Sequence, residues 1–376
     1  PKDGNGTPLE PVNPANPEEG YKPPKITDPK ANIKITYDKD DQKAKVKFVS
    51  VDDEGVETPL DTKYNIDDLA GKSGDKIPEE KVQTRVDVLK SMGYDVVDNP
   101  FDQDPTFDTK KEIDQEFTIK VKPQVSTAKP VYVVEGDKQS SEKLKDAVTT
   151  KGNEKTVDET KLPDTTDKVG DDTLTAPVTV TYGSGDNKRE ETVNVPIKVV
   201  EGYPQIVPVD PKEAPKAEDS INPDDYPAGS KFTYEKEPDT TTPGDKGVKV
   251  IVTDENGNEL VRVPATVRVV DSIPQYVVAD KANKQPEAKQ SITPGEYPDG
   301  TEFTYETPVD TTTSGEKDVV VVAKVGEDTI VKVPAKVVVV DPEVQYVFEN
   351  PQNTQPDPSE SINSDQYPDG TKFTYK

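Results

Sequence analysis

SINPDDYPAGSKFTYE at residues 220–235 recurs almost unchanged twice further along the chain. The later copies are SITPGEYPDGTEFTYE at 291–306 and SINSDQYPDGTKFTYK at 361–376. Their spacing is regular, because Tyr297 follows Tyr226 by 71 residues and Tyr367 follows Tyr297 by 70. A fixed period of this length predicts an array of small modules, each of which contacts only its neighbours.

Other motifs recur with the same period, so the repeated unit is longer than this segment. PDTTTPG at 238–244 corresponds to VDTTTSG at 309–315, and VPATVRVVD at 263–271 corresponds to VPAKVVVVD at 333–341. VPIKVVEG at 195–202 marks a more divergent unit, which lacks the YPDGT segment. We therefore predict a divergent module at 123–201, complete repeats at 202–271 and 272–341, and a truncated repeat at 342–376.

The composition predicts a mostly β protein, because 50 Val stand against only 8 Leu and β-branched residues favour strands. Alternation around Phe303 and Tyr305 predicts strands with one buried face, whereas the run 337–340 predicts a strand buried on both. Asn256-Gly257 predicts a hairpin turn. Proline precedes a Val-rich segment in each unit and predicts an edge strand or a bulge there. These prolines are Pro196, Pro264 and Pro334. Four to six such strands in a unit predict a small sandwich.

The N-terminal part differs from the repeats. Residues 1–29 are rich in proline and predict a semi-extended linker. In 30–122 the clearest helix has Pro78 near its start and Gly93 at its end, with Val82, Val86 and Leu89 on one face. Strands are predicted near 43–52, at 94–99 and at 115–122. This module therefore has a predicted β-β-α-β-β order, with the helix laid across a sheet.

Charge and composition exclude several functions. With 47 Lys+Arg against 74 Asp+Glu the net charge is −27, which disfavours nucleic-acid and anionic-membrane partners. The absence of Cys and His removes thiol nucleophiles, His bases and the usual zinc ligands. No apolar run is long enough to span a bilayer, and the missing Trp argues against a glycosidase cleft. We expect no enzyme, no cofactor and no membrane insertion, and we expect a fragment of a longer protein.

The residues resemble two families of bacterial surface modules. YPDGT, FTYE, PVDTTTSGEK and VPAKVVVVD resemble the Rib/Alpha-like repeats of Gram-positive surface proteins, specifically over 202–376. LAGKSGDKI at 69–77 and KSMGYDVVDNPF at 90–101 resemble the mucin-binding (Mub) module of lactic-acid bacterial adhesins. The resemblance implies Ig-like β-sandwich repeats behind one β-grasp-like α+β module. It also implies an extracellular protein anchored to the cell wall through segments outside this chain.

Two kinds of binding site are conceivable in 30–122. Aromatic rings that could stack on sugars are those of Tyr37, Tyr94, Phe101 and Phe107. Of these, Tyr94 and Phe101 are expected to be partly exposed because aspartates flank them, whereas Phe107 is expected in the core. A second set of residues, four aspartates, could provide oxygen ligands for Ca²⁺. The absence of a D-x-D-x-D-G register argues against such a site. That set is Asp98, Asp102, Asp104 and Asp108.

Two functions remain open at this level. In the first, the module at 30–122 binds mucin or another host glycoprotein and the repeats form a rigid stalk. In the second, every module is a structural spacer and the ligand site lies outside this chain. The recurrence of Tyr226, Tyr297 and Tyr367 in every repeat favours a folding role for these tyrosines over recognition. A Lys-Asn or Lys-Asp isopeptide crosslink also stays open.

Overall fold

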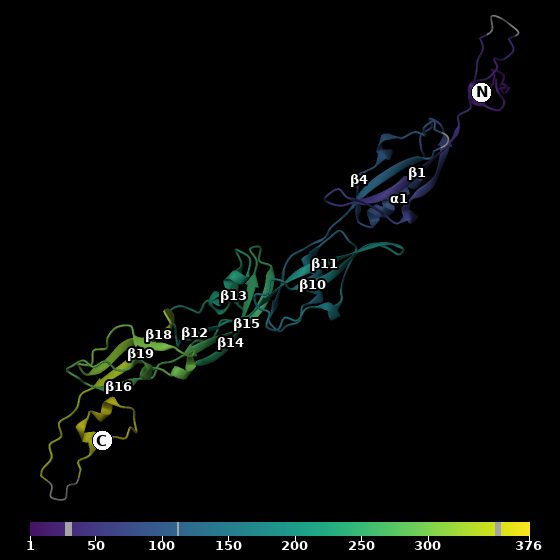
Figure 1. Cartoon of the computed structure of the whole chain (residues 1–376). Helices are drawn as coiled ribbons and strands as arrows, with labels where there is room; N and C mark the ends of the chain where they lie inside the picture. Colours follow the sequence, from purple (N-terminus) through teal and green to yellow (C-terminus); the bar gives the residue numbers. More distant parts are fainter. Residues whose placement is uncertain (27–31, 111–112, 350–354) are drawn as a thin grey trace. The chain divides into compact units, whose positions relative to one another are not determined.

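The computed structural model describes residues 1–26, 32–110, 113–349 and 355–376. Parts of the predicted linker, the first module and the truncated repeat therefore lie outside the described residues. The chain divides into two compact units (Figure 1). Unit 1 comprises Pro1–Lys129, Ser141–Lys161 and Pro177–Val195, and unit 2 comprises Pro130–Ser140, Leu162–Ala176 and Pro196–Lys376.

The first module of unit 1 is a sheet with one long helix. Its elements are β1 (Asp41–Val51), β2 (Glu57–Pro59), η2 (Thr62–Tyr64), β3 (Ile66–Lys72), α1 (Glu80–Ser91), β4 (Tyr94–Asp98), η3 (Pro100–Gln103) and β5 (Gln115–Pro123). The sheet order is β2-β1-β5-β4, and β3 also pairs with β1. The two central strands, β1 and β5, are parallel, whereas the other pairs are antiparallel. This β-grasp-like arrangement confirms the predicted helix across a sheet and adds one short strand.

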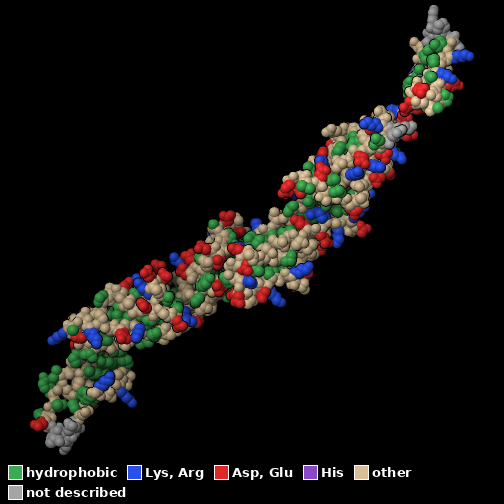
Figure 2. Space-filling view, in the orientation of Figure 1, with side chains coloured by type: hydrophobic (Ala, Val, Ile, Leu, Met, Phe, Trp, Pro, Cys, Tyr) green, Lys and Arg blue, Asp and Glu red, His purple; other side chains and the backbone are tan. Residues whose placement is uncertain are grey.

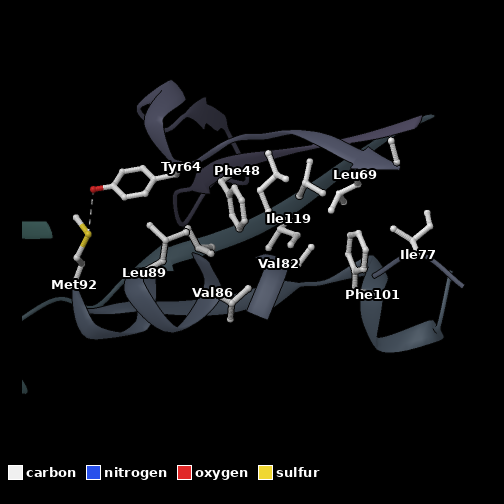
Figure 3. Packing of buried hydrophobic residues seen from close by; sticks show 14 of the residues in the cluster. Phe48, Tyr64, Leu69, Ile77, Val82, Val86, Leu89, Met92, Phe101 and Ile119 are labelled. Carbon is white, nitrogen blue, oxygen red and sulfur yellow. Dashed lines mark hydrogen bonds between the residues drawn. The ribbon is translucent and has the colours of Figure 1, made fainter. Parts of the chain in front are cut away.

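The core of this module forms where one face of β1 meets one face of α1 (Figure 3). Alternate residues of β1 are buried, and Phe48 is only 1% exposed. The helix contributes its predicted stripe of Val82, Val86 and Leu89. Gly93 ends the helix at a positive φ of 74°, a backbone conformation that glycine adopts without a steric penalty.

The proline-rich composition predicted a semi-extended linker for residues 1–29. The described part of this segment is instead partly folded back on itself. Backbone hydrogen bonds from Val12 to Gly20 and from Lys22 to Glu10, each 2.8 Å, fold it into a hairpin-like loop. A short 3-10 helix, η1 (Pro17–Glu19), lies at the tip of this loop. Asx turns satisfy the local amides, since Asp3 accepts from the amides of Asn5 and Thr7 at 2.9 Å.

The divergent module mixes short strands with a helix that the sequence patterns did not predict. Its elements are β6 (Thr127–Ala128), β7 (Val131–Val134), α2 (Ser141–Ala147), β8 (Val148–Thr149), β9 (Glu154–Val157), η4 (Glu159–Lys161), β10 (Thr175–Ser184) and β11 (Asn187–Val200). In unit 1, β9 pairs antiparallel with β10, and β6 pairs with β8. In unit 2, β7 pairs in parallel with residues 197–200 of β11.

Each complete repeat of unit 2 contains one curled four-stranded sheet and two 3-10 helices. In residues 202–271 these are β12 (Pro204–Pro208), η5 (Ala217–Ser220), η6 (Pro223–Asp225), β13 (Lys231–Tyr234), β14 (Gly244–Thr253) and β15 (Glu259–Val270). In residues 272–341 they are β16 (Gln275–Val278), η7 (Ala288–Ser291), η8 (Pro294–Glu296), β17 (Glu302–Tyr305), β18 (Gly315–Val325) and β19 (Asp328–Val340). The sheet orders, β12-β15-β14-β13 and β16-β19-β18-β17, are equivalent. The mostly β prediction is confirmed.

The repeated prolines lie where a long strand changes from one neighbour to two. Pro264 pairs with Lys249 of β14 on one side, and β15 gains its second neighbour, β12, from Thr266 onward. The nitrogen of Pro264 cannot donate a ladder hydrogen bond, so the open side of the strand is the place where it is tolerated. The prediction of an edge strand therefore holds only near the proline. Beyond Pro264, β15 has a neighbouring strand on each side. The Asn256-Gly257 hairpin also forms as predicted, between β14 and β15.

A polar network that is largely buried in the two complete repeats recurs in the truncated one and explains the recurring tyrosine of F-T-Y. The Tyr234 hydroxyl donates to Gln205 Oε1 at 2.9 Å and lies 2.9 Å from Ser220 Oγ, which is fully buried. Corresponding groups meet in the later copies. They are Gln275, Ser291 and Tyr305, and then Gln345, Ser361 and Tyr375. A satisfied network of this kind fixes the packing of the 3-10 segment on the sheet.

The D-T-T-T motif is a turn closed on its own aspartate. Asp310 accepts hydrogen bonds from the amide and hydroxyl of Thr312, at 2.9 and 2.7 Å, and from the hydroxyl of Thr313 at 2.6 Å. These donors hold the pKa of the Asp310 carboxyl well below its usual range. Asp239 binds Thr241 and Thr242 in the same way in the preceding repeat. The motif is therefore structural.

The tyrosine of the Tyr-Pro turn is buried in both complete repeats, which supports the predicted folding role. Tyr226 is 7% exposed and stacks on Tyr132, with ring centroids 5.4 Å apart. Tyr367 stacks on Tyr276 in the same way, at 5.1 Å. Among the residues that the structure describes, the hydroxyls of Tyr226 and Tyr297 are buried without a hydrogen-bond partner. The ring packing of these side chains is therefore favourable, but their hydroxyls are not satisfied.

Alkaline pH is expected to destabilise the repeat at 272–341. Burial, with a smaller contribution from the Glu296 charge, raises the pKa of the Tyr297 phenol to about 12. An unfolded chain ionises this group near pH 10, so the folded state holds the proton more tightly. The resulting stability is complete below about pH 10 and is lost as the pH rises towards 12. Urea titrations should show a larger loss for the wild type than for Tyr297→Phe, and equal losses would contradict the prediction.

The last 35 residues keep the local structure of a repeat but not its sheet. The 3-10 helices η9 (Pro358–Ser361) and η10 (Ser364–Gln366) form as in the complete copies. Within the described residues, 343–349 and 371–376 form no strand. As a result Tyr346 and Phe348 are 92% and 97% exposed.

Candidate functional site

Phe101, one of the two rings predicted to meet a ligand, is buried. It is 4% exposed and lies with the buried residues of the core (Figure 3). Its ring centroid lies 5.1 Å from that of Phe117. The expectation of partial exposure from the flanking aspartates is therefore wrong. The physical reason is η3, which Asn99 caps by accepting from the Phe101 amide at 3.2 Å. This turn directs the ring into the core and the aspartates outward.

Tyr94, the second ring, lies half-buried beneath an arginine of the next module. The Arg189 guanidinium is 5.4 Å from the Tyr94 centroid and 4.2 Å from the Tyr182 centroid. It also donates to the carbonyls of Met92 and Gln124, at 3.1 and 2.9 Å. Burial raises the pKa of the Tyr94 phenol, although the Arg189 charge opposes this shift. One face of the ring is thus occupied, and Tyr94 helps to join the first module to the β10–β11 hairpin.

No pattern in the sequence indicated a role for Arg189, because a single Lys-Arg pair in an acidic hairpin is ordinary. The first module packs closely on the β10–β11 hairpin, since a Cβ built on Gly93 would lie 2.3 Å from the Tyr182 ring. Only the fold brings these residues together.

Tyr37, another of the aromatic residues that the sequence analysis named as possible sugar contacts, is exposed. It is 72% exposed and lies in the segment before β1, which begins at Asp41. Ion pairs flank it, because Asp38 binds Lys2 at 2.8 Å and Lys39 binds Asp75. An open ring beside charged and polar groups is the combination with which proteins stack on a sugar and hydrogen-bond its hydroxyls.

The face of the sheet opposite α1, which we call the open face, carries alternating charges. Lys45 and Lys47 of β1 point away from the core and bind Asp114 and Glu116 at 3.0 and 2.9 Å. Lys120 of β5 binds Glu57 at 2.5 Å in the same way. Exposed ion pairs contribute little stability. They keep this face hydrated and rich in hydrogen-bonding groups, and both signs of charge are interspersed over the visible surface (Figure 2).

The four aspartates considered for Ca²⁺ do not converge. Asp104 binds Lys76 at 2.5 Å, which lowers the pKa of its carboxyl. Asp102 accepts from the side chain of Asn99 at 2.8 Å, and Asp108 accepts from the amide of Lys110 at 3.0 Å. Asp98 lies on β4 opposite Lys120. Across the described ranges, no three acidic side chains gather closely enough to share an ion.

The fold consists of one β-grasp-like domain followed by repeated small β domains. Comparison with family models assigns them. Residues 42–123 match the mucin binding domain, and residues 202–271 and 273–341 match the Rib domain. Both resemblances seen in the sequence are thereby confirmed. Neither model covers 124–201, so the Rib-like assignment of the divergent module stays a prediction.

Several solved structures are similar to parts of this chain. A Rib domain from Streptococcus pyogenes is 30% identical, covering 19% of this chain and 89% of its own, with a TM-score of 0.17. Human mucin-like protocadherin is 12% identical over 38% of this chain and 97% of its own, with a TM-score of 0.13. An I-band fragment of titin is 10% identical over 57% and 96%, with a TM-score of 0.10. A comparison with curated proteins found no match.

The matched domains identify a surface adhesin-like protein. They are surface-repeat and adhesin types and not enzyme families, and they are typical of bacterial surface proteins, which indicates an extracellular location. Within the part of the chain that the structure describes, no helix has the length and apolar character needed to cross a membrane.

Proposed function

We propose that this chain is part of an extracellular bacterial adhesin whose first module binds the glycans of a mucus glycoprotein. The observation that carries the proposal is the match of residues 42–123 to the mucin binding domain. The exposed ring of Tyr37 and the polar open face support it, because both are accessible and chemically suited to sugars.

The repeats at 202–271 and 272–341 would serve as the stalk. Their hydrophobic clusters include residues of the preceding module, such as Val200 and Val270, and aromatic stacking joins neighbouring modules, as between Tyr132 and Tyr226. A stalk of this kind sets the distance between the binding module and the surface from which it projects. Each module–glycan contact would be weak, and several copies on one cell would bind with avidity.

The test is binding of the full chain to immobilised mucin before and after enzymatic removal of its glycans. Glycan recognition predicts binding that is lost on deglycosylation and that does not require Ca²⁺. Absence of binding to either surface would favour the alternative function, a structural spacer whose ligand site lies outside this chain. Binding that survives deglycosylation would point to recognition of the mucin polypeptide and would contradict the proposal.

Replacing Tyr37 by alanine is expected to weaken mucin binding by roughly three- to tenfold. Stacking of an aromatic ring contributes about 0.5–1.5 kcal/mol beyond its buried area. Tyr37→Phe keeps the ring and should bind almost as well as the wild type. Tyr203→Ala removes a tyrosine that is 39% exposed in unit 2, and it provides the matched control. Surface plasmon resonance on a mucin-coated chip measures all three, and equal loss for Tyr203→Ala would show that Tyr37 is not part of the site.

A further inference from the structure

The free edge of β17 offers unpaired backbone groups. In the sheet order β16-β19-β18-β17, this strand pairs within the described residues only with β18. The amide of Glu306 donates to the carbonyl of Val320 at 2.9 Å, which fixes the alternation of the antiparallel ladder. Glu302 and Thr304 accordingly face β18, whereas the backbone N–H and C=O of Phe303 and Tyr305 point away from it.

A groove of about 690 Å³ follows this edge. One wall consists of the consecutive residues 301–305, and the other is formed by 285–289, which lead into η7. Successive residues of a strand point to opposite faces of its sheet. A groove lined by five consecutive residues therefore runs along the edge of the strand and not over one face of the sheet. An extended chain lying there would meet the outward backbone groups of Phe303 and Tyr305.

The groove is acidic, and its counterpart in the preceding repeat is not. Glu287 and Glu302 stand on its two walls, and the single lysine, Lys289, lies 3.6 Å from Glu287. At the equivalent positions the repeat 202–271 has Lys216 and Lys231. The same fold thus accepts either sign of charge at both places, so folding does not require the two carboxylates.

We propose that the groove beside β17 binds an extended, lysine- or arginine-rich polypeptide segment, which adds to the sheet as a further strand. Backbone hydrogen bonds to Phe303 and Tyr305 would provide the strand pairing, and Glu287 and Glu302 would select a basic sequence. This site is separate from the glycan-binding surface of the first module, and its test does not depend on the proposed function.

The test uses the full chain and a short fluorescent peptide of alternating lysine and threonine, at physiological ionic strength. Fluorescence anisotropy should show saturable binding. Amide hydrogen exchange, followed by NMR, should slow at Phe303 and Tyr305 on peptide addition. Two matched peptides provide controls: one has glutamate in place of lysine, and the other has N-methylated alternate amides, which cannot complete a strand ladder. Both are expected not to bind.

The charge-swap variant Glu287→Lys/Glu302→Lys has at these two positions the residues of the preceding repeat, Lys216 and Lys231, and should fold normally by circular dichroism. It is expected to weaken binding of the basic peptide by about tenfold or more. Unchanged affinity in this variant would overturn the proposal, because the overall charge of −27 would then be attracting the peptide without a specific site. Absence of slowed exchange at Phe303 and Tyr305, or no binding at all, would overturn it as well.

Discussion

Replacement of Phe48 by alanine is expected to unfold the first module and abolish mucin binding by the full chain. Phe48 is 1% exposed and lies between β1 and α1 in the core of the module (Figure 3). Truncating a buried phenylalanine costs about 3–5 kcal/mol. A domain of this size is stable by only about 5–10 kcal/mol, so the loss removes most of its stability.

Scanning calorimetry of the full chain tests this result. The transition of the first module should move to a much lower temperature or disappear, while the transitions of the repeats stay in place. Val97→Ala is the matched control, because Val97 belongs to the same module but is 58% exposed. A Phe48→Ala chain that keeps both its calorimetric profile and its mucin binding would show that the core is not built as described.

Two substitutions of Tyr226 are expected to change stability in opposite directions. Tyr226→Ala removes a ring that packs between Tyr132 and Phe232, at centroid distances of 5.4 and 5.7 Å, and should cost about 3–5 kcal/mol. Tyr226→Phe keeps the ring and removes a buried hydroxyl that has no partner among the described residues. Relieving this penalty should stabilise the repeat by about 1 kcal/mol.

Urea unfolding of the two variants beside the wild type separates these effects. The midpoint for the repeat at 202–271 should fall for Tyr226→Ala and rise for Tyr226→Phe. A fall for both variants would show that the hydroxyl has a partner, such as an ordered water, and would refute the stabilising half of the prediction. Tyr234→Phe is the contrast, because its hydroxyl is bonded to Gln205 and its loss should destabilise.

The features that could be predicted from the sequence differ between the repeats and the candidate site of the first module. In the repeats, patterns of short range sufficed: the period, the Val-rich strands, the Asn-Gly hairpin and the place of Pro264 all depend on local chemistry. The Gln205–Ser220–Tyr234 network was missed, although each of its members recurs with the period. Their recurrence is visible in the sequence, but only the coordinates show that these three side chains contact one another.

For the candidate site, local reasoning failed where burial depends on distant partners. Aspartates on both sides of Phe101 indicated a surface position, yet one turn of 3-10 helix places the ring against Phe117. Tyr94 lost part of its exposure to Arg189, which comes from another module. Tyr37 keeps its exposure because it precedes the first strand and packs against no core residue.

The sequence by itself determined the repeat period, the mostly β character and the one long helix of the first module. Each of these follows from residue types at short, regular spacings, which act through backbone preference and hydrophobic alternation. Only the tertiary structure decided which aromatic rings face water, which aspartates bind lysines, and which strand edge stays open. Those properties depend on side chains that lie far apart in the sequence and meet only when the sheets assemble.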